Sequence, residues 1–209
     1  MEKKKTLATA KPAVKIILGI VIFIVIIFIW AMGVRNNLVK KEETVKSSWS
    51  QVLNQYQRRY DLIPNLVATV QGYAEHENET FRQVIEARAN ATSFTITDEV
   101  LNNPETFKKF QTLQGDINAA LSRLLAVSEN YPDLKANESF LELQSQLEGT
   151  ENRIAVERKA FNDTTTSYNI YLKSFPKNVV ASIFNFEAKP YFDVTNDKAL
   201  EAPTVDFTK

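Results

Sequence analysis

Residues 16–34 form an uninterrupted apolar run that limits what this chain can fold into. The run contains no charged, amide or hydroxyl side chain, and Lys15 and Arg35 flank it. A helix of this length is roughly 28 Å long at about 1.5 Å per residue, which is close to the hydrocarbon thickness of a bilayer. Trp30 lies near one end, where an amphipathic ring suits the headgroup layer. Residues 16–34, from Ile16 to Val34, are therefore predicted to form a transmembrane helix after a basic segment at 1–15.

The orientation of this helix depends on a small difference in charge. Five lysines and the amino terminus precede the run, whereas Arg35 and three lysines follow it within about a dozen residues, together with Glu42 and Glu43. Because positively charged flanks favour the cytoplasmic side, the N-terminus is predicted to lie inside the cell. The bulk of the chain would then lie on the other side of the membrane.

The rest of the chain has a composition that excludes several functions. Residues 36–209 carry 19 basic and 24 acidic side chains, so this part is mildly acidic. Nucleic-acid binding depends on clustered Lys and Arg, and we do not expect it here. The chain has no cysteine, which excludes disulfides and thiolate nucleophiles. No glycine-rich phosphate loop is present, and no cofactor or small-molecule substrate is predicted.

Helical periodicity and the placement of prolines predict an all-α fold. After the anchor, residues 36–176 are divided into four helices that form an up-and-down bundle. The first begins near Leu38, the second begins at Asp61 with Pro64 in its first turn, the third runs from about Pro104 to Glu129, and the longest ends before Pro176. In the alternative, Pro64 only kinks one continuous helix of about 55 residues, which gives a three-rod spike.

Two further segments follow the predicted bundle. Residues 177–194 contain a short apolar cluster at helical spacing and then an extended stretch around Pro190. Residues 195–209 are predicted to be a disordered tail. Within this tail Pro203, Val205 and Phe207 alternate with polar residues, so the tail could also dock on a partner as an added strand.

Two groups of polar residues are candidates for a site. His76 is the only histidine and lies among Glu75, Glu77 and Glu79. A metal-dependent activity centred on it is an alternative, but helix geometry puts neighbouring residues on different faces and favours a charged surface turn. Arg59 falls within the apolar stripe of its helix, and a buried guanidinium demands a partner. We expect Asp61 or a glutamate of another helix to pair with it, unless its charge reaches water. The predicted polar cluster comprises Arg58, Arg59, Asp61, Glu157 and Arg158.

Several collinear motifs resemble those of the LemA family of bacterial single-anchor membrane proteins. They include RRYDLIPNLV at 58–67, ENYPDLKAN at 129–137, ENRI at 151–154 and KPYF at 189–192, together with the aromatic–asparagine pairs at 161–162 and 168–169. One departure is Asn36–Asn37, where the family usually has tyrosine–asparagine. The resemblance implies an N-terminal membrane helix and a helical bundle in the bacterial inner membrane, and it implies no established enzymatic activity or cofactor.

These observations favour a function based on contact surfaces. The chain is expected to be a non-enzymatic adaptor or scaffold whose soluble domain is periplasmic. Its expected partners are the lipid bilayer, other membrane or envelope proteins, or further copies of itself. Lateral assembly that remodels the membrane or envelope is the alternative.

Overall fold

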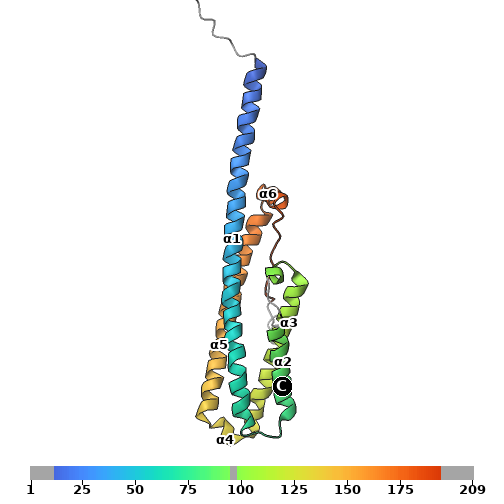
Figure 1. Cartoon of the computed structure of the whole chain (residues 1–209). Helices are drawn as coiled ribbons and strands as arrows, with labels where there is room; N and C mark the ends of the chain where they lie inside the picture. The colour runs from blue at the N-terminus through green and yellow to red at the C-terminus, as the bar shows by residue number, and fades with distance from the viewer. Residues whose placement is uncertain (1–11, 95–97, 194–209) are drawn as a thin grey trace, which may run out of the picture.

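The computed structural model describes residues 12–94 and 98–193, and within them the chain is helical with no strand. One helix is far longer than the others and extends beyond the rest of the molecule (Figure 1). The elements are α1 (Pro12–Gln71), α2 (Asn78–Ser93), η1 (Asp98–Leu101), α3 (Pro104–Val127), η2 (Ser128–Asn130), α4 (Pro132–Lys135), α5 (Glu138–Lys173) and α6 (Lys177–Ile183). The all-α class is confirmed.

Helix α1 has two parts with different surroundings. Its N-terminal part carries the apolar run, and the side chains from Ile16 to Trp30 are exposed on the described molecule. Its C-terminal part buries a stripe that includes Leu38, Val45 and Val52. Within the described residues, α1 is the one helix long and apolar enough to cross a membrane. The span predicted from the sequence therefore continues directly into the soluble domain.

The helix break predicted near Pro64 is wrong. Helix α1 passes through Pro64 and ends at Gln71, and α2 begins only at Asn78. Proline lacks the N–H that would bond to the carbonyl of Tyr60 one turn earlier. Arg88 of α2 replaces it, because its Nε donates to the Tyr60 carbonyl oxygen at 2.9 Å. The alternative, one continuous helix of about 55 residues, is right that the helix passes through Pro64. A helix of that length from near Leu38 would, however, extend well beyond Gln71, where α1 ends.

The third and fourth predicted helices agree with α3 and α5. Asn103 caps α3 by accepting hydrogen bonds from the backbone N–H groups of Glu105 and Thr106, and Pro104 occupies the first turn. Asn137 caps α5 by accepting from the N–H of Phe140. The short apolar cluster after Pro176 forms α6, and residues 184–193 continue without regular structure. The predicted tail at 195–209 lies outside the described residues.

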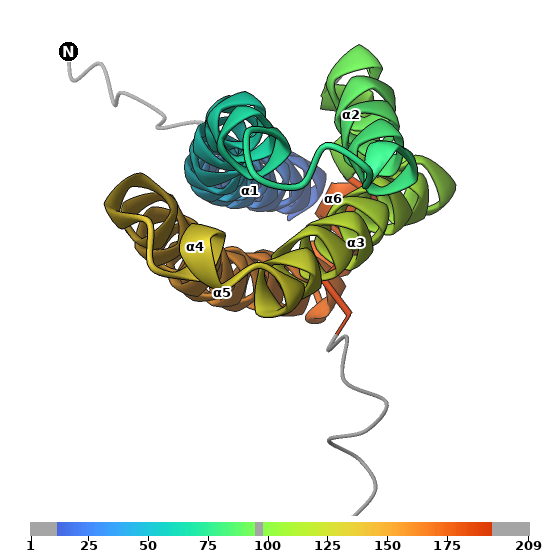
Figure 2. The same cartoon turned by 90° about the horizontal axis from the view of Figure 1, so that it is seen from below.

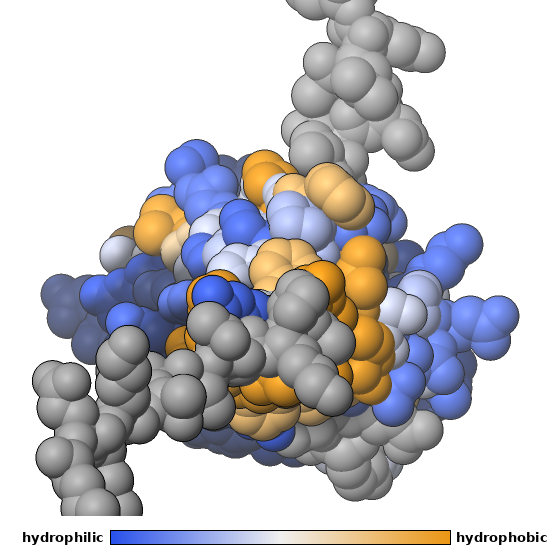
Figure 3. Space-filling view, turned by 90° about the horizontal axis from the view of Figure 1, so that it is seen from above, coloured by the Kyte–Doolittle hydropathy of each residue, from blue (hydrophilic) through white to orange (hydrophobic). Residues whose placement is uncertain are grey.

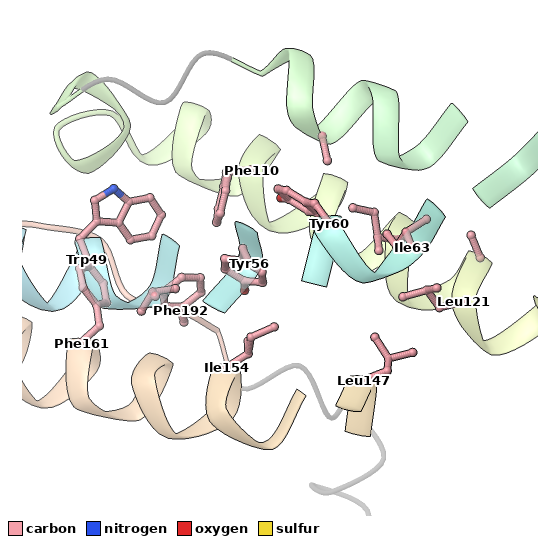
Figure 4. Close-up of a cluster of buried hydrophobic side chains, with 14 of the residues drawn as sticks. Trp49, Tyr56, Tyr60, Ile63, Phe110, Leu121, Leu147, Ile154, Phe161 and Phe192 are labelled. Atoms are coloured by element: carbon pink, nitrogen blue, oxygen red, sulfur yellow. The ribbon is translucent and has the colours of Figure 1, made fainter. Parts of the chain in front are cut away.

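The helices pack side by side, as the view from below shows (Figure 2). The exposed part of α1 extends above them (Figure 1). Helix α5 runs along α1, α2 also contacts α1, and α3 packs on α2. Large aromatic rings fill the centre, where Trp49 contacts Phe107, Phe110 and Phe161 at ring-centroid distances of 5.1–5.6 Å (Figure 4). The backbones of α3 and α5 approach each other little, and the chain after α6 enters the space between them.

Candidate functional site

The chain after α6 descends between α3 and α5 as an extended segment, residues 186–193, which we call the strap. Phe192 is 3% exposed and contacts Phe107 and Phe161 at centroid distances of 4.9 and 5.4 Å. Lys189 is also buried, and its ammonium group bonds to Glu42 and Asn102, each at 2.6 Å. The strap is therefore part of the packed domain.

Two asparagines of α5 hold the backbone of the strap. Asn169 donates to the carbonyl of Lys189 and accepts from its N–H, both at 2.9 Å. Asn162 does the same with Phe192, at 3.0 and 2.9 Å. Residues seven apart lie on one face of a helix, two turns from each other. The space between α3 and α5 thus binds an extended chain through side-chain amides that contact its backbone.

The last described residue of the strap, Asp193, lies beside an open groove. The N–H of Asp193 donates to Gln111 of α3 at 3.1 Å, and its carbonyl accepts from Arg158 of α5 at 3.1 Å. Gln111 and Arg158 also line a cavity of about 190 Å³, which continues down the helices into a wider one of about 550 Å³. The two cavities share Asn118 and Glu151. We call this continuous hollow the lower groove.

The lower groove has a polar upper part and a more apolar lower part. Buried Arg59 lies on its floor, where its guanidinium donates to Glu151 at 2.9 Å and also to Asn118 and Gln114. Gln114 in turn donates to the hydroxyl of Tyr60. The lining of the lower part comprises Asn118, Leu121, Ser122, Leu125, Leu147, Glu148, Glu151 and Asn152. Amides beside leucines suit an extended peptide, whose backbone needs hydrogen bonds and whose side chains need apolar contacts.

Burial changes the acidity of the tyrosines beside Arg59. Removal from water raises the pKa of Tyr56 to about 12, although the neighbouring charges of Arg158 and Arg59 act in the opposite direction. Burial also raises the pKa of Tyr60, opposed by its hydrogen bond with Gln114. The guanidinium carbon of Arg59 lies 5.0 Å from the centre of the Tyr56 ring. The neutral side chain of Tyr56 and the paired Arg59 therefore line the upper part of the groove.

The structure brings together only part of the predicted polar cluster. Arg59 and Arg158 line the same cavity, but the acid that pairs with Arg59 is Glu151 on α5, while Asp61 instead accepts from Gln57. Arg58 is exposed, and within the described ranges no ion pair joins Glu157 to Arg58 or Arg59.

The other predicted residues lie elsewhere. His76 is exposed in the turn between α1 and α2, and within residues 12–94 and 98–193 no group of three or more His, Asp or Glu side chains is arranged to hold a metal ion. Of the predicted anchor residues, Lys15, Ile16 and Trp30 are exposed on α1, whereas Val34 is buried and Arg35 lies beside Phe184. Pro203, Val205 and Phe207 lie outside the described residues.

Sequence analysis did not identify Asn162 and Asn169 as the residues that hold the strap. A signal was present, because each asparagine follows a buried aromatic residue, Phe161 or Tyr168, and the two pairs are seven residues apart. Such a repeat places the two aromatic–asparagine pairs on the same face of α5, two helical turns apart. Their partner, however, is a strap with no periodic pattern of its own.

Comparison with known proteins finds sequence similarity over most of the chain. The model of the LemA family matches residues 48–207, which include α1 from Ser48 onward, the helices that line the groove and the strap. The chain is 28% identical to Magnetosome protein MamQ 2 of Paramagnetospirillum magneticum, covering 80% of this chain and 68% of that protein. It is 25% identical to Magnetosome protein MamQ of Magnetospirillum gryphiswaldense, covering 86% and 72%. Protein LemA of Metamycoplasma hominis is 21% identical, covering 96% and 88%. Because the family match covers most of the chain, this protein belongs to the LemA family.

Proposed function

We propose that this chain is a membrane-anchored, non-enzymatic adaptor that holds an extended segment of a partner protein in the lower groove. The observation that carries the proposal is the strap, since the same space between α3 and α5 already binds an extended chain through Asn162 and Asn169. The lower groove continues this space and offers Asn118, Asn152 and three leucines. The occupant is therefore expected to contribute backbone hydrogen bonds and two or three apolar side chains.

The anchor gives this adaptor its place in the cell. We infer that α1 spans the bacterial inner membrane once and that the helical domain is periplasmic, which the apolar run and the lysines before it support. We also infer that the lower half of α1 forms a four-helix bundle with α2, α3 and α5. Tethering to a membrane raises the effective concentration of other membrane proteins near the groove, so that weak contacts suffice.

A photocrosslinking experiment tests the adaptor function. Benzoylphenylalanine is placed at Ser122, which lines the groove, and at exposed Asp116 of the same helix, which does not. In native membranes, illumination is expected to join the full-length Ser122 variant to an extended segment of another membrane protein, mapped by mass spectrometry. The Asp116 variant gives no such adduct. Equal adducts at both positions, or none at Ser122, would contradict the proposal.

A blocking variant makes this test sharper. The space where a side chain at Gly115 would project is open, and Gly115 lines the upper part of the groove. Gly115→Trp is therefore expected to fill the groove and abolish the Ser122 adduct, whereas Asp116→Trp leaves it intact. An adduct that persists in Gly115→Trp means that the occupant does not need the upper part of the groove.

Self-assembly through the tail is the second candidate function. Asp193 enters the open end of the groove, so residues 194–209 begin where an extended chain would continue. If the tail of one copy occupies the groove of another, the Ser122 adduct has twice the mass of the chain and maps to residues 194–209. Mixing isotope-labelled and unlabelled copies separates this adduct from one within a single chain. A crosslink within one chain, or a crosslink to another protein, contradicts self-assembly.

A further inference from the structure

The end of the domain nearest the apolar run of α1 carries an exposed apolar surface. Figure 3, seen from above, shows apolar side chains at this end of the molecule, where the exposed run of α1 also points toward the viewer. Within residues 175–184, Phe175 is 82% exposed, Ile183 69% and Val179 51%, and Phe184 is also exposed. Four large apolar side chains so close together indicate a binding surface rather than scattered exposure. We call residues 175–184 the α6 knuckle.

The α6 knuckle lies beside the point on α1 where the exposed apolar run ends. This position indicates what covers the apolar surface. Every apolar side chain from Ile16 to Trp30 is exposed, whereas Val34 is buried and Ala31 packs against the core. The Arg35 guanidinium lies 5.3 Å from the centre of the Phe184 ring. Figure 1 accordingly places α6 beside α1 where the buried part of that helix begins. The five residues from Trp30 to Arg35 rise about 8 Å, comparable with the thickness of one headgroup layer.

The charges around the α6 knuckle suit a lipid surface. Arg35 lies beside it, Lys173 ends α5 just before it, and Lys177 begins α6 with its ammonium group 4.2 Å from the centre of the Tyr171 ring. Cations at this depth attract anionic headgroups, while apolar side chains enter the top of the acyl layer. We propose that the α6 knuckle lies in the headgroup layer and binds anionic lipid, so that the domain has a second membrane contact beside α1. This inference rests on the membrane span proposed above.

Fluorescence quenching in nanodiscs tests this contact. The chain has no native cysteine, so a polarity-sensitive dye can be attached at Ile183→Cys in the full-length protein. Val156→Cys is the matched control because Val156 is similarly exposed, at 65%, but lies about 26 Å down α5 from its end. Ile29→Cys reports the span itself. The discs contain one protein copy and lipids with a nitroxide near the top of the acyl chain.

The expected result is strong quenching at Ile29 and at least threefold greater quenching at Ile183 than at Val156. Quenching at Ile29 with equal, weak quenching at Ile183 and Val156 would overturn the knuckle contact and leave the anchor intact. Absence of quenching at Ile29 would overturn the span and the inference with it. If the emission of the dye at position 183 shifts to the blue only with two protein copies per disc, the surface is covered by a second copy. That result would overturn the lipid contact.

A charge variant tests the preference for anionic lipid. Lys173→Gln combined with Lys177→Gln is expected to reduce quenching at Ile183 about twofold in discs containing phosphatidylglycerol. In phosphatidylcholine alone the same variant and its parent are expected to be equal. An identical loss in both lipids, or no loss in either, would contradict the role of the cations.

Discussion

The backbone carbonyl of Tyr60 has lost its helical partner because Pro64 has no N–H. The Nε of Arg88, 28 residues later, donates to this carbonyl at 2.9 Å. A buried carbonyl without a partner costs about 1–3 kcal/mol, so this one contact contributes to keeping α1 continuous. It also ties α2 to α1 at the point where a proline would otherwise weaken the helix.

A double-mutant cycle measures this contact. Arg88→Met is expected to lower the free energy of unfolding by about 1–2 kcal/mol, because the Tyr60 carbonyl is left unpaired. In the Pro64→Ala background the new N–H can bond to that carbonyl, and the cost of Arg88→Met is expected to fall below about 0.5 kcal/mol. Chemical unfolding in detergent, followed by circular dichroism, gives the four stabilities. Equal costs in both backgrounds would contradict the replacement of one donor by the other.

Arg59 is the second residue on which the groove depends. It is fully buried and donates to Glu151, Asn118 and Gln114. Arg59→Met should lower the midpoint of thermal unfolding and reduce the free energy of unfolding by about 2 kcal/mol. The reason is that the buried side-chain oxygen of Gln114 loses the donor it has in Arg59. Glu151 is 36% exposed and can reach water, which limits the loss. The exposed neighbour variant Arg58→Met serves as the control, and an unchanged midpoint in Arg59→Met would show that its bonds contribute nothing.

Tyr56 is predicted to make stability depend on pH in the alkaline range. A tyrosine in the unfolded chain loses its proton near pH 10, whereas burial raises the pKa of Tyr56 in the folded state to about 12. Between these values the folded state holds more protons than the unfolded state, so the free energy of unfolding falls as the pH rises. Tyr56→Phe is expected to make this decline shallower by about 2 kcal/mol between pH 10 and 12. Unfolding curves at pH 9 and 11.5 check it, and parallel declines would refute it.

At the scale of elements, the strap determines the shape of the space between α3 and α5. It occupies the upper half of that space down to Asp193, which contacts Gln111 and Arg158 at the upper edge of the lower groove. The strap has no regular hydrogen-bond ladder of its own. Asn162 and Asn169 provide paired hydrogen bonds to it, and their loss should loosen it without unfolding the helices.

Hydrogen exchange can detect this loosening. Asn169→Ala is expected to speed exchange of the Lys189 amide about tenfold, and Asn162→Ala that of the Phe192 amide, since each amide loses its acceptor. Asn152→Ala on the same helix is the control, because Asn152 lines the lower groove and does not bond to the strap. Uniformly faster exchange throughout α3 and α5 would instead indicate general destabilisation.

At the scale of the whole molecule, one helix belongs to both the anchor and the domain. Since α1 runs from Pro12 to Gln71, the groove is held at a set distance from the end of the apolar run. The lysines before the run predict, but do not test, the side of the membrane on which the groove lies. The periplasmic placement therefore needs a direct measurement.

Cysteine labelling provides that measurement. In intact spheroplasts, Thr208→Cys is expected to react with a membrane-impermeant maleimide, because the domain is predicted to face outward. Lys3→Cys is expected to react only after permeabilisation. Since the chain has no other thiol, mass spectrometry of the purified protein reads each result directly. The reverse pattern would place the groove in the cytoplasm.

The sequence determined the features that depend on neighbours along the chain. The apolar run of α1, the buried stripes of α3 and α5 and the caps at Asn103 and Asn137 all follow from local periodicity or capping. The need of Arg59 for a partner was also predictable, since it lies in an apolar stripe. Such features require no knowledge of which helices meet.

Only the tertiary structure decided the remainder. The Tyr60 carbonyl left free by Pro64 accepts from Arg88 of another helix, the partner of Arg59 is Glu151 some 92 residues later, and Asp193 is held between Gln111 of α3 and Arg158 of α5. Each is a contact between segments distant in sequence, whose register no local pattern specifies. Local proline chemistry favours a helix end near Pro64, and contacts with another helix, among them the Arg88 hydrogen bond, oppose that preference.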